Sequence, residues 1–390
     1  MNWNDLLCPR REFVSPSFNP QDIRTEFRKD YHRIVGSASF RRLQDKAQVY
    51  PLQRGDFVRT RLTHSVEVSS FAGSLGETIF QKLIDNGVNG VDDRVRENCR
   101  DILECAGLVH DIGNPPFGHF GEFAIRQWFK ENFPKLMFCG EPVEDLLTVQ
   151  MKEDFLNFEG NAQALRVLTR LHCLMYPGQG MNLTYALLNT IIKYPVSSTG
   201  IDKTSGDIRT KKMGYFFSEQ ELFREVTEST GAQDFRYPLT FILEAADDLA
   251  YKTADIEDAA VKGYISYELI LDELRSEKYR SQCRTEEEAE ELEKSAESLE
   301  KSFNSAKKFN MHDPQLKAVQ RWIVKTQSSL VYSASNAFCD NYDAVMAGEM
   351  KTELFENSPA RVLMKVLGNI AYENAFRSND IVKSELSESA

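Results

Sequence analysis

The strongest constraint on the fold is a helical spacing of apolar residues. They recur at intervals of three and four positions in five segments, 62–84, 98–110, 160–175, 183–193 and 239–262. This period places apolar side chains on one face of a helix, so each segment is predicted to be an α-helix packed against a core. Strand-like alternation is scarce, and residues 215–217 (Tyr-Phe-Phe) are the best short candidate. We therefore expect an all-α fold with at most a short β-hairpin.

Helix-breaking residues and a charged segment divide the chain further. Glycine, proline and small polar residues cluster at 113–118, 177–180 and 195–206, which predicts loops. The segment 275–308 is dense in charge, and its acidic residues gather near Thr285, where a helix dipole favours them. A solvated helix is expected there, with an acidic interaction arm as the alternative. We predict a core over residues 1–265 and a helical C-terminal region over residues 266–390.

Composition excludes several classes of protein. The 390 residues are 42% hydrophobic and 27% charged, as in an ordinary globular protein, and the formal net charge of −12 argues against a surface built wholly for nucleic acid. A local focus of positive charge is still present, and a solvated basic helix face is its alternative explanation. It consists of Arg24, Arg28, Lys29, Arg33, Arg41 and Arg42, together with His32.

The expected location is the cytoplasm. No run approaches the ~18–20 apolar residues of a membrane helix, and the first residues lack the basic and apolar regions of a secretory signal. The seven cysteines are scattered singly without a Cys-x-x-Cys pair, so reduced thiols are expected.

Two segments carry candidate metal ligands. Arg61 and His64 are three positions apart, so on a helix they share a face. The apolar helix 98–110 ends in His110-Asp111, followed at once by glycine and two prolines. A buried imidazole and carboxylate are costly unless they are satisfied, and a divalent metal would satisfy them. The alternative is an aspartate hydrogen-bonded locally beside a core histidine.

A third segment strengthens the metal hypothesis. Asp247, Tyr251 and Asp255 occur at i, i+4 and i+8, which is one stripe of one helix within an alanine-rich sequence. Such a polar stripe is typical of an inward-facing polar surface. Asp247 could complete a four-ligand set, while Tyr251 and Asp255 could hydrogen-bond a sugar. The alternative is a solvated polar face.

The glycine-rich segment after the prolines offers a candidate for proton transfer. His119 and Glu122 are three apart, a spacing at which a carboxylate orients a histidine. The alternative is a loop histidine in water.

Together these motifs resemble the HD superfamily and, more narrowly, the bacterial deoxyguanosinetriphosphate triphosphohydrolase family. The run 110–122, His-Asp-Ile-Gly-Asn-Pro-Pro-Phe-Gly-His-Phe-Gly-Glu, is far more specific than a bare His-Asp pair. The resemblance covers roughly residues 20–260 in the expected order. Its segments are 39–49, 56–64, 110–122, 158–164, 193–195 and 244–258.

The resemblance implies roles for the matched residues. The metal ligands would be His64, His110, Asp111 and Asp247. His119 would act in proton transfer, supported by Glu122. The deoxyribose would be read by Gln48, Tyr251 and Asp255. The phosphates would be contacted by Arg61, Asn161, Lys193 and Tyr194, with Lys211 or Lys212 as additional candidates.

The resemblance also implies a fold and a reaction. An HD-type catalytic core would fill residues 1–265, with an N-terminal substrate-binding segment. A metal-activated water would attack the α-phosphorus of a deoxynucleoside triphosphate, dGTP above all, and release a deoxynucleoside and tripolyphosphate. The mixed ligand set suits Mn²⁺ or Mg²⁺ and also accommodates Fe²⁺, Co²⁺ or Zn²⁺.

Other functions and partners stay open. One alternative is broad use of all dNTPs, and a second is another HD-type nucleotide phosphohydrolase. A third, of a different class, is a regulatory protein that binds nucleotides or single-stranded DNA. The resemblance implies a homo-oligomer, with a hexamer among the family's assemblies, and a nucleotide or single-stranded DNA effector. No membrane partner is expected.

Overall fold

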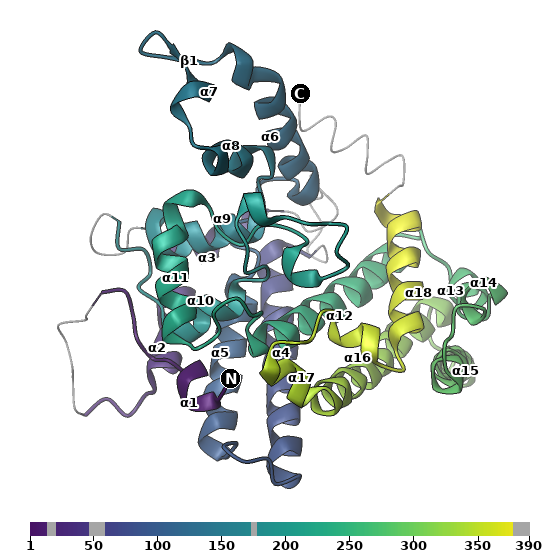
Figure 1. Ribbon diagram of the computed structural model, residues 1–390. Helices are drawn as coiled ribbons and strands as arrows, with labels where there is room; N and C mark the ends of the chain where they lie inside the picture. Colours follow the sequence, from purple (N-terminus) through teal and green to yellow (C-terminus); the bar gives the residue numbers. More distant parts are fainter. Residues whose placement is uncertain (14–20, 47–58, 173–177, 377–390) are drawn as a thin grey trace.

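The computed structural model describes residues 1–13, 21–46, 59–172 and 178–376, and this part of the chain is predominantly helical (Figure 1). Its α-helices are α1 (Trp3–Leu6), α2 (Glu26–Val35), α3 (Ala38–Arg41), α4 (Arg61–Asp85), α5 (Asp93–Val109), α6 (Gly118–Asn132), α7 (Val143–Leu146), α8 (Val149–Leu156), α9 (Gly160–Arg166), α10 (Tyr185–Ile191), α11 (Gln220–Ser229), α12 (Pro238–Val261), α13 (Tyr267–Leu274), α14 (Glu277–Arg280), α15 (Glu286–Lys308), α16 (Pro314–Asp340), α17 (Tyr342–Ala347) and α18 (Arg361–Ala371).

Short 3₁₀ and π turns connect these helices. The 3₁₀ turns are η1 (Arg42–Asp45), η2 (Phe133–Lys135), η4 (Ser198–Gly200), η5 (Ile208–Thr210), η6 (Phe217–Glu219) and η7 (Leu354–Asn357), and the π turns are η3 (Val167–Leu171) and η8 (Tyr372–Phe376). Within the described ranges the only sheet is a two-stranded antiparallel hairpin of β1 (Met137–Phe138) and β2 (Glu141–Pro142). The prediction of an all-α fold with at most a short hairpin is confirmed.

The expected strand at 215–217 is wrong. Tyr215 stacks on Phe223, with ring centroids 4.0 Å apart, and Phe217 begins the turn η6. Tyr215 thus packs on helix α11, and Phe216 lies against Phe158 with ring centroids 6.0 Å apart, so these aromatic side chains make tertiary contacts without strand pairing.

Helices α4 and α5 form the centre of the fold, and α12 packs across both. Thr60 begins α4 with a reciprocal capping box to Thr63, and Asp92 caps α5 by accepting from the Val95 N–H. The two helices approach closely at Gly107, where an added Cβ would lie 2.5 Å from the Ser69 Cα. Only glycine permits this distance, which fixes the end of α5 against the start of α4.

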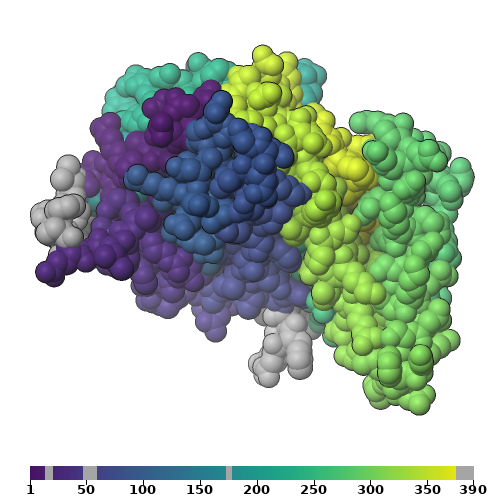
Figure 2. Space-filling model, turned by 90° about the horizontal axis from the view of Figure 1, so that it is seen from below, coloured from purple at the N-terminus to yellow at the C-terminus, as the bar shows by residue number. Residues whose placement is uncertain are grey.

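The C-terminal helices cover one flank of this core. Figure 2 shows the green and yellow-green residues along the side of the purple and blue ones. One cluster of buried apolar residues runs from Trp3 to Ala371. The charged helix predicted after Thr285 is confirmed as α15, which Thr285 caps. One of its acidic residues, Glu288, is buried and ion-paired with Arg361, with Nε and Oε1 2.6 Å apart.

The segment from α6 to α8 projects from the core at the top of Figure 1. It carries several exposed apolar side chains: Phe120, Phe123, Trp128, Met137, Phe138, Leu146 and Val149. No helix of the described residues is both long enough and apolar enough to cross a bilayer.

Candidate active site

Four predicted ligands converge where α4, α5 and α12 meet. His64 lies in the first turns of α4, His110 is the residue that ends α5, and Asp247 lies midway along α12. Ligand atoms of His64, His110 and Asp111 all lie within 4.8 Å of one another. Asp247 Oδ1 lies 3.3 Å from His64 Nε2 and 3.4 Å from His110 Nε2. We call these four residues the inner cluster.

The ring of His110 is oriented for metal binding. Its Nδ1 lies 2.8 Å from the Gly107 carbonyl oxygen, so that nitrogen donates a proton and Nε2 faces the cluster. His110 Nε2 is buried and has no hydrogen-bond partner among the described residues. A buried ring nitrogen that faces two carboxylates, 3.4 and 3.5 Å away, fits a cation, which can be a proton or a metal ion.

Electrostatics show that the inner cluster attracts positive charge. Burial alone would lower the pKa of His110, but the carboxylates of Asp111 and Asp247 raise it to about 9. Burial also works to raise the pKa of Asp111, yet Arg61 and His110 lower it to about 2. Two imidazoles and two carboxylates therefore fit a divalent metal, which would supply the charge that a proton on His110 otherwise supplies.

Second contacts fix Asp111 in place. Arg61 Nη1 lies 2.5 Å from Asp111 Oδ2, and Asn114 Nδ2 donates to Asp111 Oδ1 at 2.5 Å. The turn after Asp111 packs tightly on α9, because an added Cβ on Gly113 would lie 2.1 Å from the Ala164 nitrogen. This contact links the inner cluster to the segment that contains Asn161.

A buried chain of alternating charges leads away from Asp247. Lys193 Nζ lies 3.3 Å from Asp247 Oδ2 and 2.6 Å from Glu244 Oε1. Arg236 lies 3.7 Å from the other Glu244 oxygen and 3.1 Å from Glu353 Oε2. The predicted residue Lys193 therefore touches a predicted metal ligand, and Tyr194 is buried beside it.

His119 and Glu122 form a second group, which we call the outer pair. Their side chains lie 3.1 Å apart, Nδ1 to Oε2, as the spacing predicted. The side chain of His119 is 89% exposed, whereas that of Glu122 is 3% exposed. Burial alone would raise the pKa of Glu122, but hydrogen bonds from His119 and the Gly160 N–H lower it below its usual value.

The structure describes two of the three residues that were predicted to bind the sugar. Tyr251 and Asp255 lie on α12 one and two turns after Asp247, as expected, and Asp255 is buried. Burial and the nearby Asp258 raise the pKa of Asp255 well above its usual value. Gln48 lies outside the described residues.

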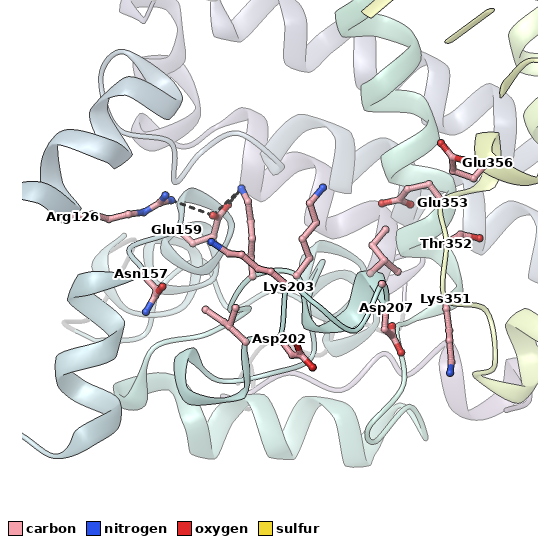
Figure 3. A pocket seen from close by; sticks show the side chains of 15 residues that line it. Arg126, Asn157, Glu159, Asp202, Lys203, Asp207, Lys351, Thr352, Glu353 and Glu356 are labelled. Carbon is pink, nitrogen blue, oxygen red and sulfur yellow. Dashed lines mark hydrogen bonds and ion pairs between the residues drawn. The ribbon is translucent and has the colours of Figure 1, made fainter. Parts of the chain in front are cut away.

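A cavity of about 620 Å³ is drawn in Figure 3, and none of the inner-cluster residues lines it. Its residues Arg126 and Glu353 connect it to the outer pair and to the charge chain. Its lining is charged but balanced, with the cations Arg126, Lys203, Lys211, Lys212 and Lys351 and the carboxylates Glu159, Asp202, Asp207, Glu353 and Glu356. Figure 3 shows Arg126 and Glu159 joined by a dashed line on one side of the cavity, with Glu353 on the other side.

Sequence reasoning missed two residues that the structure brings to the site. Glu159 is buried and contacts both Asn161 and Lys212, and Arg126 contacts Glu122 and Glu159. Arg126 was visible as the i+4 neighbour of Glu122 on a helix. Glu159 directly precedes Gly160-Asn161, but no local spacing indicates that its side chain turns toward Lys212.

Known proteins resemble this chain over the segments that contain these residues. The HD domain family matches residues 61–188. A deoxyguanosinetriphosphate triphosphohydrolase-like protein of Listeria monocytogenes is 42% identical over 99% of this chain and 81% of its own length. The deoxyguanosinetriphosphate triphosphohydrolase of Yersinia enterocolitica is 33% identical over 99% of this chain and 79% of its own.

Proposed function

This chain belongs to the deoxyguanosinetriphosphate triphosphohydrolase family of HD-domain proteins, and from that premise we propose that it hydrolyses deoxynucleoside triphosphates, dGTP foremost. The products are a deoxynucleoside and tripolyphosphate. The observation that carries the proposal is the inner cluster of two histidines and two carboxylates, with the cations Arg61 and Lys193 in contact with its carboxylates.

The inner cluster supplies the metal site. His64, His110, Asp111 and Asp247 would hold a divalent cation, with Mn²⁺ or Mg²⁺ as the first candidates and Fe²⁺, Co²⁺ or Zn²⁺ as alternatives. Such a cation lowers the pKa of water and polarises a phosphoryl oxygen. Arg61 and Asn114 keep the Asp111 carboxylate in a fixed orientation.

The bond changes follow from the products. A water oxygen bonds to the α-phosphorus, and the bond between that phosphorus and the 5′ oxygen breaks. The 5′ oxygen takes a proton and leaves as the deoxynucleoside hydroxyl. His119 is the donor in this proposal, because its ring is exposed and Glu122 holds its Nδ1. The proton that the attacking water gives up returns through solvent to His119, so that the donor is restored.

Cationic and polar side chains bind the rest of the substrate. Asn161, Lys193, Tyr194 and Arg61 contact the phosphates, with Lys211 and Lys212 on the cavity wall as further contacts. Tyr251 and Asp255 bond the 3′ hydroxyl of the sugar together with Gln48. Their position on α12, one and two turns from Asp247, supports this assignment.

The test is chromatographic product analysis with each dNTP separately, with and without Mn²⁺. We expect tripolyphosphate and deoxynucleoside from dGTP, dependence on the metal, and loss of activity in His110→Ala. Equal rates on all four dNTPs would point to the broad-specificity alternative. Release of phosphate or pyrophosphate would indicate another HD-type phosphohydrolase, and absence of any hydrolysis would contradict the proposal.

We also propose that the protein is a homo-oligomer. The exposed apolar side chains on α6 and the hairpin, among them Phe123, Trp128 and Phe138, support self-association. Analytical ultracentrifugation measures the assembly, and repetition with dNTPs or single-stranded DNA tests for an effector. A monomer at all concentrations would contradict this part of the proposal.

A further inference from the structure

The side chain of Glu159 has an unusual set of partners. Its residue occupies the N-cap position of α9, yet the carboxylate makes no cap hydrogen bond to that helix. It lies instead 2.9 and 3.0 Å from Lys212 Nζ and 2.7 Å from Asn161 Nδ2, and Arg126 Nη2 is 3.6 Å away. The side chain is only 2% exposed (Figure 3). The buried Glu159 carboxylate therefore contacts the polar side chains around it and does not cap helix α9.

Arg126 connects Glu159 to the outer pair. The same nitrogen, Arg126 Nη2, lies 3.0 Å from Glu122 Oε2, and Arg126 Nε donates to the Phe158 carbonyl at 2.7 Å. Glu122 Oε2 is also the oxygen that His119 contacts. Arg126 and His119 thus share one carboxylate oxygen, and Arg126 divides its charge between Glu122 and Glu159.

We propose that Glu159 is a positioning residue that couples phosphate binding at Lys212 to the orientation of His119, through Arg126 and Glu122. The inference rests on the proposed function, since it assigns a role in the same site. A polyphosphate at the cavity wall attracts the Lys212 ammonium away from Glu159. The Glu159 carboxylate then attracts Arg126 more strongly, and Glu122 Oε2 is left to hold His119 alone. The proton donor becomes fixed when the phosphates are bound.

Kinetics of Glu159→Gln and Glu159→Asp give the first test. In Glu159→Gln we expect kcat for dGTP to fall about 10-fold or more, the size typical of groups that orient a catalytic ligand. The pH profile of kcat should shift, and KM should change less than kcat. Glu159→Asp keeps the charge and should recover part of kcat. Glu356→Gln, which removes an exposed carboxylate from the same cavity, is the matched control.

Histidine NMR gives a second test that does not depend on turnover. With Mg²⁺ as a diamagnetic cation, the ring signals of His119 are assigned by comparison with His119→Ala. Inorganic tripolyphosphate is then added as the probe. The His119 signals should shift in the wild type and in Glu356→Gln, and should stay in place in Glu159→Gln.

The outcomes separate the two proposals. Unchanged kcat and pH profile in Glu159→Gln, or equal His119 shifts in variant and wild type, would overturn the positioning role. If Glu159→Gln fails to fold, Arg126→Lys takes its place, since a shorter reach to Glu122 breaks the same connection. A wild type without dNTP hydrolysis would refute the proposed function, while the tripolyphosphate titration would still decide the coupling.

Discussion

The inner cluster and the outer pair each contain a histidine held by a second group, but the two regions are built differently. His110 has a side chain only 1% exposed and is fixed by a carbonyl of its own helix, whereas the side chain of His119 is 89% exposed and meets one carboxylate. Three packed helices determine the position of the inner ligands. The outer pair depends on polar contacts at the edge of a cavity. In the proposed mechanism, the packed core therefore presets the metal ligands, whereas the orientation of the proton donor stays adjustable.

The largest expected effect follows from removing an inner ligand. His110→Ala should abolish dNTP hydrolysis and metal binding, because it deletes one of four ligands at a site where even an outer-shell change costs about 10–100-fold. Metal content by elemental analysis and thermal unfolding with and without Mn²⁺ provide the measurement. Wild type should gain about 3 kcal/mol of stability at a metal concentration 100 times Kd, and the variant none.

The matched control is His172→Ala. His172 is also buried, but its Nδ1 contacts Ser39 and not the inner cluster. This variant should keep its metal and its response to Mn²⁺. Retention of stoichiometric metal by His110→Ala would show that the inner cluster is not the metal site.

Removing the outer histidine should separate catalysis from binding. We expect His119→Ala to lower kcat by about 100-fold or more, the usual contribution of a general acid, with metal content and unfolding unchanged because the ring is exposed. Steady-state kinetics and elemental analysis on the same sample measure both. His312→Ala, an exposed histidine at the start of another helix, is the control. Equal losses of metal and activity in His119→Ala would contradict separate roles of the two regions in catalysis and in metal binding.

The difference between the regions also explains what could be predicted from the sequence. His64, His110 and Asp247 stand at regular positions on long amphipathic helices, so their convergence follows from helix periodicity once the helices pack. The outer pair was found because its two residues share one helix turn. Glu159 was not predicted, since its partners Lys212 and Arg126 lie 53 and 33 positions away in the sequence. Such contacts depend on the tertiary packing of separate segments and leave no local pattern.

The junction between the two regions can be disturbed at Gly113. Gly113→Ala places a Cβ about 2.1 Å from the Ala164 nitrogen, so α9 must shift away from the turn that carries Asp111. We expect a loss of about 1–3 kcal/mol in the free energy of unfolding, as for other overpacked sites, and a lower kcat. Denaturant unfolding measures the first. Gly368→Ala in α18 is the control, since its Cβ meets only the Lys252 side chain at 3.5 Å, and a helical alanine should stabilise slightly. Equal stabilities of the two variants would contradict close packing at the turn.

The smallest expected effect concerns the pKa of Glu353, the residue of the charge chain that lines the cavity. Burial raises the pKa of Glu353 to about 7, although Arg236 acts to lower it. The native protein therefore holds a proton that the unfolded chain has released between about pH 4.5 and 7. Through this group, stability is highest below pH 4.5 and declines as the pH rises to 7.

Glu353→Gln cannot titrate, so the stability difference between wild type and variant should fall by about 1–2 kcal/mol from pH 5 to pH 8. This estimate is kept small because the side chain is 29% exposed. Urea unfolding of both proteins across this range measures the difference, and Glu356→Gln controls for the loss of a carboxylate from the cavity. Parallel pH curves would mean that Glu353 titrates as freely in the folded protein as in the unfolded chain. A declining difference would show that burial keeps the proton on Glu353 beside Arg236, at the cavity end of the charge chain.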